Sequence, residues 1–162
     1  MTILNLATPP PDKLSDLIEL AIADARKLDR YDYAPTWMTW HRRNPADGKC
    51  MVCLAGAVIA GTLGCARETI IDIAAEDSAD PRSTTITDEP WRRALRALDS
   101  AREGHWNEAF ENLRGSYPAD ELRNALDALP RPRHREFNAW NQFDAHLASL
   151  ADCASKLREI GL

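Results

Sequence analysis

The feature that most constrains the fold is a long run of residues without charge, from Cys50 to Ala66. It contains the sequence CMVCLAGAVIAGTLG, residues 50–64, in which apolar and small residues occupy every helical face. A helix that is apolar all round must be buried on all sides. The run is interrupted by glycines and falls short of the ~20 apolar residues that a membrane-spanning helix needs. We therefore expect residues 50–63 to form a helix in the centre of the protein.

Apolar residues recur three or four positions apart in five further segments, which is the spacing of helices with one buried face. These segments are 14–28, 88–104, 106–115, 118–129 and 140–157. The prediction is a mainly α bundle of about five to six helices around the buried helix, with room for one short strand or hairpin. We expect residues 1–162 to form a single helical domain.

Residues that favour helix ends support several of these segments. Asp12 is expected to cap the first helix, and Thr87 or Asp88 is expected to cap the helix over 88–104. Gly104 and Gly115 follow two of the periodic segments, as glycine commonly does at the end of a helix.

Composition and charge narrow the class of protein. The chain has 162 residues, of which 44% are hydrophobic and 28% charged, as in folded soluble domains. Its net charge of -5 disfavours general binding to nucleic acid or to an anionic membrane, because such a surface repels phosphate on average. The first residues lack the basic start and apolar core of a secretory signal. We expect a cytoplasmic protein whose four cysteines are thiols and not a disulfide framework.

The two cysteines that open the uncharged run raise the question of a metal site. Cys50 and Cys53 are three residues apart, so on a helix they would share one face. With His41 and a distant residue such as Cys153 they offer the ligand types of a tetrahedral zinc site. A single C-x-x-C pair is a weak signal, and cysteine often packs as a small apolar residue. We expect Cys50 and Cys53 to be core residues, with a zinc site as the alternative and no other cofactor.

The segment TWMTWHRR, residues 36–43, has the most unusual local composition. Trp37 and Trp40 stand beside Arg42 and Arg43, and tryptophan and arginine are enriched at the energetic centres of protein interfaces. If the segment is exposed, these four residues are our candidates for binding a partner protein. The alternative is a loop held to the core by its tryptophans. The acidic segment 72–80 is a second candidate contact.

The last periodic segment allows two interpretations. Its apolar residues alternate three and four apart, as in a coiled-coil seam. They are Trp140, Phe143, Leu147, Leu150, Ala154 and Leu157. Packing along the bundle is the preferred interpretation, and a seam between two copies is the alternative. We therefore expect a monomer, or a homodimer through the C-terminal helix.

Motifs of known catalytic chemistry are missing from the sequence. GAVIAGTLG lacks the lysine of a phosphate-binding loop, and the chain has no G-x-S-x-G or H-E-x-x-H motif. No catalytic residues can be assigned, which leaves enzymatic activity open and favours a protein without it. The basic segment RPRHR, residues 131–135, is interpreted as an extended, solvated connection.

The Trp-His segment, the apolar block CMVCLAGAVIAGTLG and the sequence WRRALRALDSAREGHWNEAF, residues 91–110, resemble small bacteriophage and prophage proteins. The resemblance covers residues 37–64 and 91–110 best, and it carries no catalytic residue, cofactor or fold. It implies a small phage protein that works in the host cytoplasm. We expect it to bind a host or phage protein, with host takeover or anti-defence as the setting. The alternatives are a zinc metalloprotein and a self-assembling structural protein.

Overall fold

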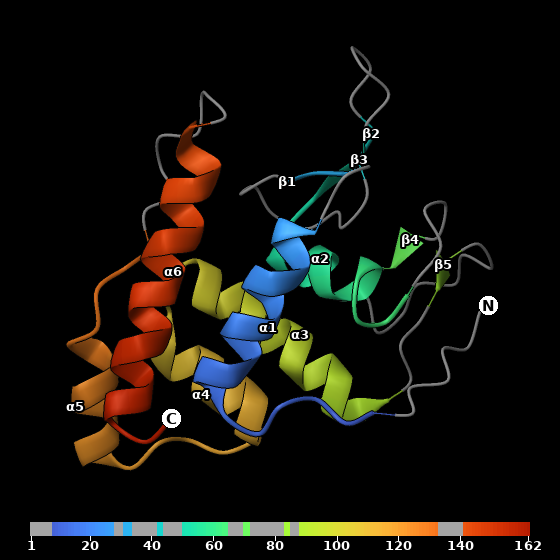
Figure 1. Cartoon of the computed structure of the whole chain (residues 1–162). Coiled ribbons are helices and arrows are strands. Elements are labelled where there is room, and N and C mark those ends of the chain that lie inside the picture. Colours follow the sequence, from blue (N-terminus) through green and yellow to red (C-terminus); the bar gives the residue numbers. More distant parts are fainter. Residues whose placement is uncertain are drawn as a thin grey trace.

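The computed structural model describes residues 8–27, 31–33, 42–43, 50–64, 70–71, 83–84, 88–132 and 141–162. Most of these residues are helical, which confirms the prediction of a mainly α bundle (Figure 1). The helices are α1 (Leu14–Arg26), α2 (Leu54–Ala60), α3 (Glu89–Arg102), α4 (Trp106–Arg114), α5 (Asp120–Asp127) and α6 (Asn141–Glu159). The strands are β1 (Tyr31–Tyr33), β2 (Arg42–Arg43), β3 (Cys50–Val52), β4 (Ile70–Ile71) and β5 (Ser83–Thr84).

The strands form two small sheets. In the first, the order is β1-β3-β2, with β1 parallel and β2 antiparallel to β3. In the second, β4 runs parallel to β5. Because β3 is followed at once by α2, the first sheet is joined directly to the helical core. Figure 1 shows β2 and β3 extending away from the helices at the start of α2.

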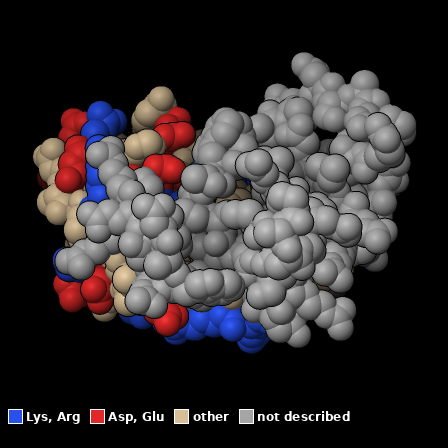
Figure 2. Space-filling view, turned by 90° about the horizontal axis from the view of Figure 1, so that it is seen from above, with Lys and Arg blue, Asp and Glu red and all other residues tan. Residues whose placement is uncertain are grey.

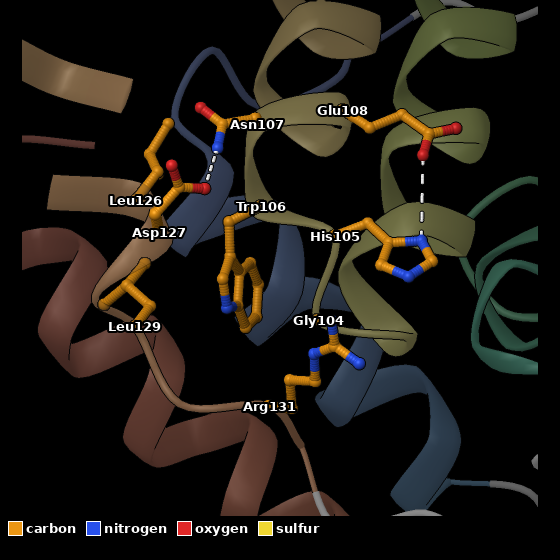
Figure 3. Close-up of a pocket in the computed structure, with 9 residues that line it drawn as sticks. All are labelled: Gly104, His105, Trp106, Asn107, Glu108, Leu126, Asp127, Leu129 and Arg131. Atoms are coloured by element: carbon orange, nitrogen blue, oxygen red, sulfur yellow. Dashed lines mark hydrogen bonds and ion pairs between the residues drawn. The ribbon is translucent and has the colours of Figure 1, made fainter. Parts of the chain in front are cut away.

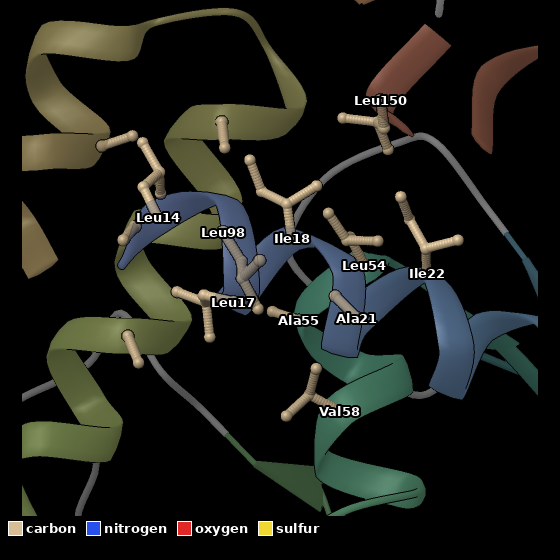
Figure 4. Close-up of a cluster of buried hydrophobic side chains, with 14 of the residues drawn as sticks. Leu14, Leu17, Ile18, Ala21, Ile22, Leu54, Ala55, Val58, Leu98 and Leu150 are labelled. Atoms are coloured by element: carbon tan, nitrogen blue, oxygen red, sulfur yellow. The ribbon is translucent and has the colours of Figure 1, made fainter. Parts of the chain in front are cut away.

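Helix α1 is the element around which four of the other five described helices gather. It packs against α6, α2, α3 and α4. Figure 4 shows its apolar side chains directed toward Leu54 and Val58 of α2, Leu98 of α3 and Leu150 of α6. The buried apolar residues of α1 are Leu14, Leu17, Ile18, Ala21, Ile22 and Ala25, at the positions that helical spacing predicts. One continuous apolar cluster therefore joins all six described helices.

Residues 53–59 of the uncharged run are buried as expected, but the run is not one helix over residues 50–63. Residues 50–52 are strand β3, and α2 begins only after Cys53, whose backbone is extended. Tertiary pairing explains the difference, since Met51 lies between Asp32 of β1 and Arg42 of β2 in the sheet. From Leu54 to Ile59 every residue is buried, which agrees with a helix that is apolar on all sides.

The end of α2 is set by close contact with α1. A Cβ atom at Gly61 would lie 2.7 Å from Cγ of Asp24, so only glycine fits without a shift. Thr62 Oγ1 donates a hydrogen bond of 2.5 Å to Oδ2 of the buried Asp24. Because Gly61 has no side chain, the C-terminal ends of α1 and α2 can approach closely, and the hydrogen bond between Thr62 and Asp24 holds them together.

Three of the predicted helix ends are confirmed and one is wrong. The Asp88 carboxylate accepts a hydrogen bond of 3.0 Å from the Trp91 N–H, and Gly104 and Gly115 have positive φ after α3 and α4. Asp12 does not cap α1, because the helix starts after Lys13 and has no side-chain cap. Instead, the Ser15 N–H donates to the carbonyl oxygen of Leu162 at 3.2 Å. One backbone N–H in the first turn of α1 therefore has its partner in Leu162.

The described residues of the predicted C-terminal seam pack against helices of the same chain. Leu147, Leu150, Ala154 and Leu157 are fully buried on α6, which packs against α1. At the surface of the same contact, Arg158 lies 3.2 Å from Asp16 and 2.8 Å from Glu19. This arrangement favours the bundle interpretation over a seam between two copies. The side chains of Trp140 and Phe143 lie outside the described residues.

None of the helices in the described ranges combines the length and the apolar character needed to cross a bilayer.

Candidate functional site

The predicted partner-binding segment lies largely outside the described residues. This holds for Trp37, Trp40 and His41, as it does for the acidic segment 72–80. Arg42 and Arg43 form β2, opposite Met51 and Cys50 of β3. Among the described strands β2 pairs with β3 alone, so it lies at an edge of the sheet. An edge strand presents backbone N–H and C=O groups to which another chain can pair.

The prediction that Cys50 and Cys53 share one face of a helix is wrong. Cys50 is in β3, whereas Cys53 is the N-cap residue of α2. The Cys53 sulfur accepts a hydrogen bond of 3.5 Å from the Gly56 N–H, in the way that a serine oxygen commonly does at this position. In the described ranges no three histidine, cysteine or carboxylate residues are grouped as metal ligands.

The thiols of Cys53 and Cys153 are both buried and free. Burial raises the pKa of Cys53, and the nearby Asp99 carboxylate raises it further. Burial raises the pKa of Cys153 to about 11, and this thiol lies 3.5 Å from the carbonyl oxygen of Pro130. A cysteine acts as a nucleophile or as a metal ligand in its thiolate form. Because both thiols have raised pKa values, neither Cys53 nor Cys153 is suited to nucleophilic attack or to metal binding.

We expect both thiols to resist alkylation in the folded protein. Iodoacetamide at about pH 8 reacts with the thiolate, and a raised pKa together with burial suppresses that form. Peptide mass mapping should find Cys53 and Cys153 unmodified in the native protein and modified after unfolding in urea. Rapid alkylation of Cys53 in the native state would contradict the assignment of a buried, protonated thiol.

A buried arginine lies close to Cys53, at the end of α3. Arg102 is only 1% exposed, and its guanidinium lies 3.6 Å from Oδ1 of Asp99 and 3.3 Å from Oε1 of Glu103. Burial raises the pKa of Asp99, although Arg102 opposes the shift. Arg102, Asp99 and Glu103 therefore form a charge cluster at the helical core, and we interpret its role as structural.

A pocket of about 260 Å³ lies where α4 begins and α5 ends (Figure 3). Its apolar lining comes from Trp106, Leu126 and Leu129. The indole of Trp106 is 3% exposed, and its Nε1–H donates to the carbonyl oxygen of Pro130 at 3.0 Å. This hydrogen bond fixes the ring in place and joins α4 to the segment after α5.

Polar side chains surround this apolar lining. His105 Nδ1 lies 3.7 Å from Oε2 of Glu108, and the Asn107 amide nitrogen donates to the Asp127 carboxylate. Arg131 lies across the pocket from Asp127, with its guanidinium near Gly104 in Figure 3. The pocket thus combines an apolar lining with charged groups of both signs.

The surface charge of the described residues is mixed. In Figure 2, acidic and basic side chains lie next to each other on one side of the face, and Lys and Arg gather along its lower edge. This part of the face is therefore not uniformly acidic, although the chain carries a net charge of -5.

The pocket was missed in the sequence analysis because its residues come from two separate segments. Arg131 belongs to the RPRHR segment, for which the sequence predicts a solvated connection, and Trp106 opens the periodic segment 106–115, for which it predicts only a helix with a buried face. Contact between α4 and α5 brings the segments together. The only local signals were Gly104 before a helix and Pro130 after one, and neither indicates a pocket.

The fold and these sites define a mainly helical protein with buried thiols, an edge strand rich in arginine and one small described pocket. No protein-family model matches the chain, and no curated protein or solved structure is similar to it.

Proposed function

We propose that the chain is a non-enzymatic protein of phage or prophage type that binds a host or phage protein. A role in host takeover or in blocking host defence is the setting that fits such a protein best. The proposed contact is formed by Trp37, Trp40, Arg42 and Arg43. The observation that carries this proposal is the position of Arg42 and Arg43 in β2, at an edge of the sheet.

An edge strand suits recognition of another protein for a physical reason. Its unpaired backbone groups can hydrogen-bond to an extended segment of the partner, while side chains beside it provide specificity. Residues 36–41 lead directly into β2, so both tryptophans are within a few residues of this edge. Arginine can also make planar, bidentate contacts with carboxylates of the partner.

The chemistry of the described helices agrees with a non-enzymatic role. Their two buried cysteines have raised pKa values and are poor nucleophiles. The His105–Glu108 pair is exposed at 50% and 61%, so water surrounds it. These groups are better explained by packing and solubility than by catalysis.

The proposal is tested by affinity capture from a host lysate with the tagged full chain. We expect Trp40→Ala combined with Arg42→Ala to lose the captured protein while circular dichroism stays unchanged. The matched control changes another aromatic residue and another arginine, Tyr117→Ala with Arg123→Ala, both of which are exposed. Equal capture by the parent and by the Trp40/Arg42 variant, with both folded, would refute the proposed contact.

Two alternative functions predict different masses in native mass spectrometry. A zinc protein that uses Cys50, Cys53 and His41 would carry one metal per chain and lose stability with a chelator. A self-assembling structural protein would give larger species as its concentration rises. The proposed binding protein has the mass of the metal-free chain, as a monomer or as a homodimer through α6.

A further inference from the structure

The pocket between α4 and the end of α5 is independent of the proposed partner contact. Its volume of about 260 Å³ lies just below the roughly 300–1,000 Å³ of most small-molecule sites. A pocket of this size accommodates one compact organic molecule. Its size therefore favours a small metabolite-like ligand.

The charged residues around the pocket indicate which charge a ligand would carry. Glu108 lies 3.7 Å from His105, and Asp127 accepts a hydrogen bond from Asn107. Arg131 has no ion pair or hydrogen bond with any other residue in the described ranges. Both carboxylates therefore have polar neighbours within the lining, whereas the Arg131 guanidinium is a cation that a ligand can pair with.

Arg131 is also positioned by the backbone. A Cβ atom at residue 104 would lie 2.8 Å from Cγ of Arg131, and Gly104 has a φ of +74°, which side chains rarely tolerate. The turn between α3 and α4 therefore packs directly against the stem of Arg131. On the other side, the hydrogen bond from Trp106 to Pro130 fixes the residue that precedes Arg131.

We propose that this pocket binds a small organic acid that has an apolar body. Its carboxylate pairs with the Arg131 guanidinium, which offers parallel N–H donors that match the two oxygens. Its apolar body lies against Trp106 and Leu129. The site adds a small-molecule ligand to a chain whose proposed function is to bind a protein.

The test uses benzoate as the probe and benzamide as its uncharged analogue of nearly the same shape. We expect benzoate to shift the indole N–H resonance of Trp106 in proton–nitrogen NMR spectra, with a Kd on the order of 1 mM for so small a ligand. Benzamide should shift it far less. A titration in which benzoate leaves this resonance unchanged, or benzamide binds as well as benzoate, would overturn the proposal.

Variants locate the carboxylate contact. Arg131→Gln keeps the Cγ atom that packs on Gly104 but removes the charge, and we expect about tenfold weaker binding of benzoate or more. Arg131→Lys should retain part of the affinity. The matched control is Arg123→Gln on the neighbouring helix α5, outside the pocket, which should bind as the parent does. Unchanged benzoate affinity in a folded Arg131→Gln protein would show that the guanidinium is not the binding group.

Discussion

Replacing Trp91 with alanine is expected to lower the free energy of unfolding by about 4 kcal/mol. Trp91 is 1% exposed on the inner side of α3, so the variant would leave a large cavity in the apolar cluster that joins the helices. The variant also removes the hydrogen bond of 2.7 Å from Nε1 to the carbonyl oxygen of Thr8. Urea denaturation followed by circular dichroism measures the change.

Trp91→Phe separates the two contributions. Phenylalanine retains much of the buried ring but cannot donate to Thr8, so we expect a smaller loss of about 1–2 kcal/mol. A free energy of unfolding for Trp91→Ala within about 1 kcal/mol of the parent value would contradict this prediction. It would show that Trp91 contributes less to the packing of α3 than its burial indicates.

Replacing Arg102 with methionine is expected to cost about 3 kcal/mol of stability at neutral pH. Methionine fills the space of the arginine stem, but it leaves Asp99 and Glu103 without the cation beside them. These carboxylates are 27% and 32% exposed, so water compensates them only in part. The cost comes from uncompensated charge more than from lost packing.

The same variant should show a diagnostic dependence on pH. Burial already raises the pKa of Asp99 above 3.8, and removing Arg102 takes away the interaction that lowers it. An acid with a raised pKa in the folded state favours folding when protonated, so stability is present at low pH and is lost as pH rises through the folded-state pKa. We therefore expect the cost of Arg102→Met to shrink between about pH 7 and pH 4.

A double variant serves as the control for this prediction. Asp99→Asn in the Arg102→Met background removes the titrating group, so most of this pH dependence should disappear. Thermal unfolding of the parent, the single variant and the double variant at both pH values gives the comparison. A cost of Arg102→Met that is the same at both values would rule out Asp99 as the coupled group.

Much of the helical architecture could be predicted because helix periodicity is a local property. The inward positions of α3, such as Trp91, Leu95 and Leu98, follow directly from their spacing and are buried. Asp88, Gly104 and Gly115 also act within a few residues of the ends they define. The strand over residues 50–52 could not be predicted, because its partners β1 and β2 lie far from it in the sequence.

The candidate sites were less accessible to prediction, and again the reason is distance along the chain. The placement of Cys50 and Cys53 on one helical face failed because the helix begins after Cys53. The pocket depends on the α4–α5 contact, which brings Arg131 opposite residues 104–108. The contact proposed for Trp37 and Trp40 remains a prediction that affinity capture will test.

The contact between α1 and α6 has a consequence for how the chain folds. It joins residues as far apart as Asp16 and Arg158, which are separated by 142 positions. Contacts over such long loops form late and slow the search for the native state. During synthesis, α1 leaves the ribosome long before α6 does, so its apolar face toward α6 stays uncovered until α6 has been made. A nascent chain of this kind is a natural substrate for chaperones that shield exposed helices until their packing partners are available.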